Sequence, residues 1–275
     1  MGDLERVLRV VSELRRRTVR ILLVLAPIFA FLITFQLRFA SVRLLGLSVP
    51  LAYPFPNLFD NVTAQVFGAL RAWMLPPGVQ LLNLGVGDSV MVQMEIGLLL
   101  TVTIGMPWIV HEVGAFLVPA LRNNERLLLR QIGIPATVLF AVGLAVGLAF
   151  LTPLTYRFLF LYVDAMGLDQ VLGVQQFVTF TLLYSVAFGL VFELPVFIYA
   201  LTRLGVVRAS TWRQHWRGAV IGALVFGMIV TPDNSGVTMI LIAVPMMALY
   251  LGGALFASRW ERARTSSPPP GAAPG

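Results

Sequence analysis

The chain has 275 residues, of which 58% are hydrophobic and 12% are charged, and its mean hydropathy is +0.85. This composition is too apolar for a soluble domain of that length. The 20 basic residues are all arginine, the formal net charge is +7, and the lack of cysteine excludes disulfides and thiolate metal or redox sites. We therefore expect an integral membrane protein.

Six long stretches of the sequence carry almost no charge. A bilayer core about 30 Å thick needs roughly 20 apolar residues in a helix, so each stretch can hold one span. Such runs do not alternate as barrel strands do, and helices satisfy their own backbone hydrogen bonds in hydrocarbon. We predict an all-α protein with six transmembrane helices over residues 21–258. The stretches lie between Arg20 and Arg38, Asp88 and Arg122, Arg130 and Arg157, Asp169 and Arg203, Arg217 and Asp233, and Asp233 and Arg259.

The arginines fall overwhelmingly on one side of this predicted domain. Six crossings place both termini on the same side, and 16 of the 20 arginines lie there. The positive-inside rule therefore predicts that both termini are cytoplasmic. The predicted cytoplasmic loops are residues 117–130 and 203–217, and the predicted external loops are residues 39–90 and 153–173.

The first 20 residues are predicted to form a cytoplasmic amphipathic segment. Apolar residues recur there at helical spacing, which favours a surface helix leading into the first span. No small-residue cleavage site follows the first apolar run, so the segment does not read as a cleavable signal. The apolar positions are Leu4, Val7, Leu8, Val11 and Leu14.

The long external loop and the C-terminal tail are both punctuated by proline and glycine. Within residues 39–90, apolar residues from Phe59 to Trp73 step by three and four, which predicts an amphipathic helix on the outer interface. Residues 259–275 end in SSPPPGAAPG and are predicted to be a disordered cytoplasmic tail.

Two glycine pairs and one short run bear on helix packing. Gly143 and Gly147 in the third span, and Gly218 and Gly222 in the fifth, are spaced for close approach of helices. The fifth span has only 15 uncharged residues before Asp233, which predicts a short helix.

Glu193 is an acid well inside the fourth predicted span. Placing it there costs at least about 2.5–3 kcal/mol on insertion scales, so such acids usually face a partner or a wet cavity. The structural alternative is a protonated side chain that is hydrogen-bonded to a neighbouring helix. Pro195, two residues later, frees backbone carbonyls and can bend the helix.

Signatures of catalysis are missing from the sequence. His111-Glu112 begins like a zinc-protease helix, but Ala115 stands where the second histidine ligand is needed. There is no nucleophile elbow and no Walker loop. We therefore expect no enzyme activity, no metal site and no cofactor.

Four segments resemble TatC, the core subunit of the twin-arginine protein translocase. They occur in the order of that family and extend from residue 12 to about residue 250. Residues 12–17 (SELRRR) resemble its N-terminal motif, and residues 116–126 (FLVPALRNNER) its first cytoplasmic loop. Residues 188–195 (FGLVFELP) resemble its fourth span, and Thr231-Pro232 with residues 243–250 its last turn and span.

The resemblance implies a receptor and not an enzyme, with a concave bundle as its fold. It implies binding of twin-arginine signal peptides of folded cargo proteins. It further implies single-span partners of the TatA and TatB type, a homo-oligomeric complex, the proton-motive force, and the bacterial cytoplasmic membrane. Glu193 and Pro195 match the family's contact with partner helices. The signal-peptide site that it implies comprises Glu13, Glu125, Phe116, Arg15, Arg17 and Arg126.

Acidic side chains at that site suit the recognition of arginine. A guanidinium matches a carboxylate with two parallel hydrogen bonds, which an ammonium cannot copy. A strongly positive cytoplasmic face also repels basic peptides unless acids receive them. The alternative for Glu13 and Glu125 is an ion pair with Arg16, Arg17 or Arg126, and both roles are compatible because surface pairs exchange readily.

Two positions depart from the family pattern, and two other functions stay open. Asp233 directly follows Thr231-Pro232, one or two places before the family's usual acid, and Leu251 stands where an acid is usual. A proton-coupled transporter of a small solute would use Glu193, although no pair of half-helices marks a binding site at the middle of the membrane. An intramembrane enzyme is disfavoured by the missing motifs.

Overall fold

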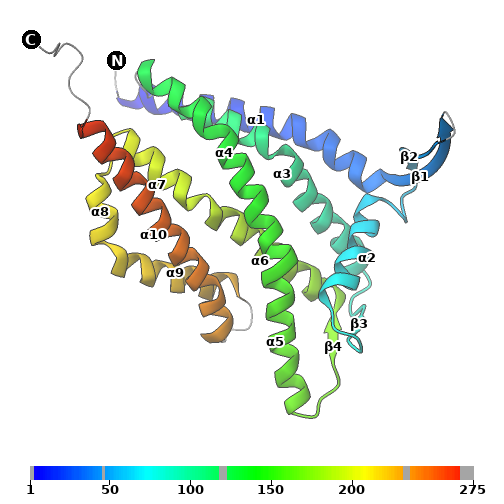
Figure 1. Ribbon diagram of the computed structural model, residues 1–275. Coiled ribbons are helices and arrows are strands. Elements are labelled where there is room, and N and C mark those ends of the chain that lie inside the picture. The colour runs from blue at the N-terminus through cyan, green and yellow to red at the C-terminus, as the bar shows by residue number, and fades with distance from the viewer. Residues whose placement is uncertain (1–2, 45–46, 118–122, 232–235, 267–275) are drawn as a thin grey trace, which may run out of the picture. The chain divides into compact units, whose positions relative to one another are not determined.

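The computed structural model describes residues 3–44, 47–117, 123–231 and 236–266 (Figure 1). Most of these residues are helical. The chain divides into two compact units, Met1–Leu117 with Leu148–Leu182, and Val118–Gly147 with Leu183–Gly275.

Two long helices, α1 (Asp3–Thr34) and α3 (Asp88–Leu117), pack side by side in the first unit. Their approach is close because α3 has glycine where α1 presents bulky side chains. A Cβ atom added at Gly97 would lie 2.9 Å from the Phe29 ring, and one at Gly105 would lie 2.1 Å from Leu25. The expected amphipathic segment and the first span are one continuous helix, α1.

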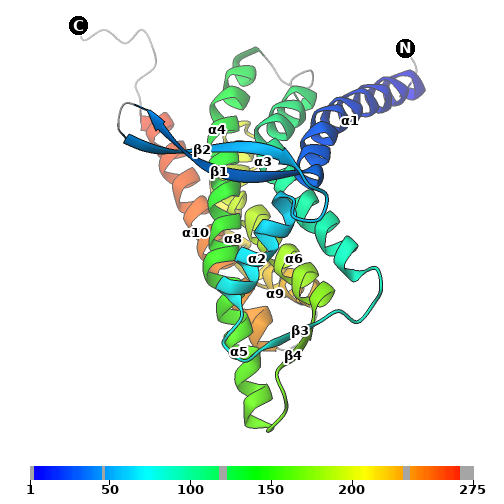
Figure 2. The ribbon, with the colours of Figure 1, turned by 90° about the vertical axis from the view of Figure 1, so that its right-hand side faces the viewer.

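The loop expected over residues 39–90 instead begins with a β-hairpin, which corrects the all-α prediction (Figure 2). Strands β1 (Phe35–Leu44) and β2 (Leu47–Pro56) pair antiparallel, with Phe35 opposite Pro56 and Leu44 opposite Leu47. The prolines at 50, 54 and 56 do not prevent pairing, because they are an even number of residues apart. In an antiparallel pair, alternate residues direct their backbone N–H away from the partner, where proline is tolerated.

Helix α2 (Val62–Met74) follows the hairpin and lies within the amphipathic pattern that the sequence showed. Asn61 caps its first turn and is fully buried. The Asn61 Oδ1 accepts from Ala64 N at 3.0 Å and from Thr63 Oγ1 at 2.6 Å. Its Nδ2 donates to the Ile33 carbonyl at 2.7 Å and to Gln93 Oε1 at 3.1 Å, so this one amide links α1, α2 and α3.

The external loop expected over residues 153–173 is mostly helix. A π-helical segment, η2 (Gly147–Leu151), leads into α5 (Thr152–Ala165). Pro153 lies in the first turn of α5, directly after the π-helical segment, and the helical run from Ile132 to Ala165 continues through it. The connection that remains carries β4 (Val171–Gly173), which pairs parallel with β3 (Gln80–Leu82) before α6 (Val174–Phe192) begins.

In the second unit, α10 (Gly236–Ser266) packs against α7 (Leu194–Arg203), α8 (Ala209–Gln214) and α9 (Trp216–Val230). The cytoplasmic loop expected over residues 203–217 therefore contains a helix, α8. Its position is held by Tyr250 Oη, which donates to the Trp212 carbonyl at 2.6 Å, and by Trp212 Nε1, which donates to Thr202 Oγ1 at 3.1 Å.

Helices also extend into one predicted loop and into the predicted tail. Helix α4 (Asn123–Val146) includes the second half of the loop expected over residues 117–130. The tail expected to be disordered from residue 259 is helical as far as Ser266, because Glu261 accepts a hydrogen bond from Ala209 N at 3.2 Å and Arg203 lies over the Trp260 ring. Residues 267–275 lie outside the described residues.

Among the described residues, five helical segments are long and apolar enough to cross a membrane: Val10–Thr34, Asp88–Phe116, Ile132–Ala165, Val174–Arg203 and Gly236–Ala263. The fifth predicted span corresponds to α9, which is apolar but has only 15 residues. The count of six spans and the cytoplasmic position of the termini stay predictions.

The two glycine pairs have different surroundings. A Cβ atom at Gly143 would lie 2.6 Å from the Phe188 carbonyl oxygen, and one at Gly147 would lie 2.9 Å from Ser185 Cα. This pair therefore permits close packing against the second half of α6. Apart from the adjoining backbone of its own helix, no described atom lies within 4 Å of a Cβ atom built at Gly218 or Gly222, so the second pair does not pack closely against the rest of the described chain.

We expect Gly143→Ala to destabilise the protein by about 1–3 kcal/mol, because the new methyl group meets a backbone oxygen that cannot rotate away. Gly222→Ala is the matched control, since it adds the same methyl group in open space and raises helix propensity. Thermal denaturation in detergent measures both variants. Equal midpoints for Gly143→Ala and Gly222→Ala would contradict the packing described above.

Candidate recognition site

An arginine bridges two acids at the N-terminal end of the first unit. Arg17 donates to Glu13 Oε1 from Nη2 at 2.8 Å and from Nε at 3.2 Å, and to Glu112 Oε2 from Nη1 at 3.1 Å. Glu13 and Arg17 are four residues apart on α1 and so share a helix face. Glu112 comes from α3, 95 residues further along the chain, and the packing of α3 on α1 brings it there.

The three side chains differ strongly in exposure. The exposed fraction is 35% for Glu13, 18% for Arg17 and 4% for Glu112. The cluster is therefore closed on its Glu112 side and open to the surroundings on its Glu13 side. Two carboxylates face one guanidinium, so the three side chains carry a net negative charge beside the exposed Arg15 and Arg16.

Sequence reasoning anticipated part of this cluster. Arg17 is one of the arginines predicted as an alternative partner for Glu13, and in the structure Glu13 pairs with Arg17. Glu112 was not among the predicted site residues. The available signal was an acid near the end of the second apolar stretch, on the arginine-rich side, and only the packing of α1 on α3 connects it with Glu13.

Of the other predicted signal-peptide residues, Arg15 lies on α1 and the rest lie on α3 and α4. Phe116 is half-buried, and it lies one helical turn beyond Glu112 on α3. Glu125 and Arg126 are in the first turn of α4, but their side chains are outside the described part of the structure. Proximity of Glu125 to Glu13 therefore stays a prediction.

Glu193 lies at a break between two helices. Helix α6 ends at Phe192 and α7 begins at Leu194, with Pro195 in its first turn. A proline in that turn cannot donate to the preceding backbone, which accounts for the interruption. The Glu193 Oε1 is buried and has no hydrogen-bond partner among the described residues. This carboxylate oxygen therefore has unused hydrogen-bonding capacity. Asp233 lies outside the described residues.

A second acid within an apolar helix already has a partner. Thr179 on α6 lies 3.0 Å and 2.9 Å from the two carboxylate oxygens of Glu95 on α3, through its Oγ1 hydroxyl. Glu95 is not among the predicted site residues. No group of three His, Asp or Glu side chains that could hold a metal ion occurs among the described residues.

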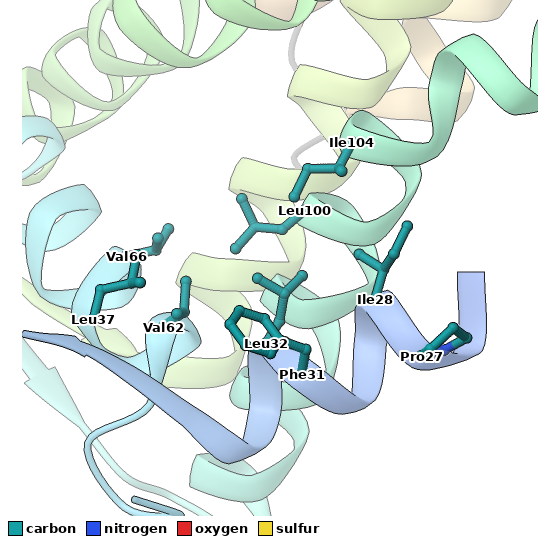
Figure 3. Close-up of a pocket in the computed structure, with 9 residues that line it drawn as sticks. All are labelled: Pro27, Ile28, Phe31, Leu32, Leu37, Val62, Val66, Leu100 and Ile104. Atoms are coloured by element: carbon teal, nitrogen blue, oxygen red, sulfur yellow. The ribbon is translucent and has the colours of Figure 1, made fainter. Parts of the chain in front are cut away.

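The first unit also holds an apolar cavity of about 580 Å³ (Figure 3). It lies among α1, β1, α2 and α3, and its wall presents no hydrogen-bonding side chain. It can accept only an apolar group, so it is separate in chemistry from the arginine cluster. The lining residues are Pro27, Ile28, Phe31, Leu32, Leu37, Val62, Val66, Leu100 and Ile104.

These features define the class of the protein: it is a multi-pass α-helical membrane protein that carries paired acids on its helices. The family model described as Sec-independent protein translocase protein (TatC) matches residues 9–245. The chain belongs to the TatC family, which confirms the resemblance found in the sequence motifs.

Individual relatives agree with this assignment. The chain is 38% identical over 256 residues to the Sec-independent protein translocase protein TatC of Cenarchaeum symbiosum (strain A), covering 93% of this chain and 96% of that protein. It is 30% identical over 243 residues to the protein of the same name from Deinococcus radiodurans, covering 87% and 80%. A crystal structure of the twin-arginine translocase receptor TatC superposes with a TM-score of 0.72 at 24% identity, covering 92% of this chain and 99% of that one, and so shares the fold.

Proposed function

We propose that this protein is the receptor and core subunit of a twin-arginine translocase. It binds the twin-arginine signal peptides of folded cargo proteins at the cytoplasmic face of the bacterial cytoplasmic membrane, where both termini lie. Single-span partner subunits join several copies of it, and the proton-motive force drives export. The observation that carries the proposal is the Glu13–Arg17–Glu112 cluster, in which two acids already hold a guanidinium.

The chemistry of the cluster suits an arginine side chain. Hydrogen bonds between a guanidinium and carboxylates are charge-assisted and fix the plane of the fork. The neighbouring arginines make the surface repulsive to a basic peptide in general, so only a peptide whose arginines reach the acids gains binding energy. The cluster thereby selects for arginine at defined positions.

The other proposed residues complete a site for two arginines. Glu125 on α4 receives the second guanidinium, with Arg126 beside it, and Phe116 offers an aromatic face close to Glu112. A ring within about 6 Å of a guanidinium adds a cation–π attraction. Arg15 belongs to the same site at its exposed rim.

A binding comparison tests the proposal directly. Purified protein in detergent is incubated with a twin-arginine signal peptide and, in parallel, with the same peptide carrying two lysines. We expect clear retention of the first and little of the second, because an ammonium cannot bond along a carboxylate edge at two points. Equal retention of the two peptides would contradict a twin-arginine receptor.

We further propose that Glu193, beside Pro195, is the contact for the transmembrane helices of partner subunits. Its unpartnered buried oxygen supports this role. We expect Glu193→Gln to be mild and Glu193→Leu worse, because interhelical polar contacts in membranes contribute well under about 1 kcal/mol and glutamine keeps one. Export of a folded twin-arginine reporter gives the ranking.

The alternative function predicts a different ranking. In a proton-coupled transporter Glu193 must gain and lose a proton, which glutamine cannot do. If Glu193→Gln abolished export as completely as Glu193→Leu while partner binding stayed intact, the docking role would be wrong and proton coupling would be favoured.

A further inference from the structure

We infer that Arg17, in the absence of a peptide, occupies the binding position of an arginine of the signal peptide. Glu112 forms one side of that position and determines its specificity. The inference rests on the proposed function and deepens it. It assigns an internal competitor to the site and adds an acid that the family motifs did not indicate.

The geometry points to a preformed guanidinium site. One guanidinium directs three N–H groups at two carboxylates from different helices, at distances of 2.8, 3.1 and 3.2 Å. The two acids therefore stand on different edges of a guanidinium plane. Arg17 uses Oε1 of Glu13 and Oε2 of Glu112, which leaves the second oxygen of each acid unused by Arg17.

Exposure sets the direction from which a peptide arrives. Glu13 is the most exposed of the three side chains, whereas Glu112 lies beneath them at 4% exposure. An incoming arginine meets Glu13 first, and it reaches Glu112 only when Arg17 moves aside. Ion pairs at such partly exposed positions are individually weak, so one guanidinium can exchange with another.

Exchange has a measurable consequence. While Arg17 is bound to both acids, the peptide site is closed. The apparent affinity for the peptide is then the intrinsic affinity multiplied by the fraction of molecules in which the site is open. Removing Arg17 opens the site and leaves two carboxylates without a cation between them. Binding of a peptide arginine then strengthens.

Glu112 gives the site its selectivity for arginine. With two acids on different edges, a planar fork bonds to both, while the ammonium of lysine is a compact point charge that cannot span them in one plane. Without the second acid, only Glu13 remains, and lysine competes more closely with arginine.

The first experiment measures binding of a labelled twin-arginine signal peptide to Arg17→Gln in detergent. We expect about three- to tenfold tighter binding than in the unmodified protein, as for release of an internal competitor. Arg16→Gln is the matched control, because it removes the same charge from an exposed neighbour. Arg17→Lys keeps a cation that fills the site poorly, so its affinity should fall between the unmodified protein and Arg17→Gln. The Arg17→Lys variant therefore still tests the inference if Arg17→Gln fails to fold.

The second experiment measures Glu112→Gln with twin-arginine and twin-lysine peptides. We expect about tenfold weaker binding of the arginine peptide, as for loss of a charged hydrogen-bond partner, and a smaller ratio between the two peptides. Glu95→Gln is the matched control, since Glu95 is an acid of the same helix that contacts Thr179.

The outcomes separate this inference from the proposed function. If the unmodified protein does not prefer the arginine peptide, the proposed function fails. If it does, and Arg17→Gln and Arg17→Lys bind no more tightly than Arg16→Gln, Arg17 is not a stand-in for the peptide arginine. A Glu112→Gln variant that keeps the full preference for arginine overturns the role of Glu112.

Discussion

Glu125→Gln is expected to weaken binding of a twin-arginine signal peptide by about 10- to 150-fold, which corresponds to about 1.5–3 kcal/mol for the loss of a charged hydrogen-bond partner. Glutamine keeps the shape of the side chain but loses the charge and the second acceptor edge that a guanidinium needs. Site-specific crosslinking of the peptide, at matched protein amounts, measures the effect. Unchanged crosslinking would remove Glu125 from the site.

Two comparisons make the Glu125 result specific. Asp169→Asn removes an exposed acid in the connection between α5 and β4, and it should leave crosslinking unchanged. The double variant of Glu13 and Glu125 should lose less binding than the sum of the single variants, because both acids act on one ligand. Losses that add would indicate separate roles for Glu13 and Glu125.

Asn61→Ala is expected to destabilise the protein by about 2–4 kcal/mol, because it removes a helix cap and leaves buried polar groups without partners. The buried amide holds the Ala64 N–H, the Thr63 hydroxyl and the Ile33 carbonyl. Thermal denaturation in detergent, followed by circular dichroism, measures the change.

Asn83→Ala is the control for Asn61, since Asn83 is an exposed asparagine between β3 and α3. It should denature at the temperature of the unmodified protein. The sequence Asn61-Val62-Thr63 also has the form of a glycosylation acceptor, but burial of Asn61 assigns it to the link between α1, α2 and α3. If Asn61→Ala and Asn83→Ala were equally stable, that link would contribute nothing.

Local patterns in the sequence were sufficient to predict several of the helices and the family of this protein. Uncharged runs located the long helices α1, α3, α6 and α10, because insertion in hydrocarbon depends on the apolarity of each segment by itself. The three- and four-residue spacing of apolar residues located α2, because an amphipathic helix carries that period in its own sequence. Motifs were sufficient for the family, and Pro195 indicated the helix break beside Glu193, because a missing N–H acts on its own helix.

Other features depended on groups distant in the chain, and the tertiary structure alone decided them. The prolines of β2 read as loop signals, but β2 pairs with β1 along its whole length, and the prolines share one alternation of the strand, as tolerated proline positions must. The last turns of α10 depend on Glu261 and Trp260 meeting residues on α7 and α8. Glu112 meets Arg17 because α3 packs on α1, with glycines at the points of close approach. By itself the sequence determined which segments are long and apolar enough to cross a membrane, while packing decided which acid faces which arginine, since that depends on contacts between helices far apart in sequence.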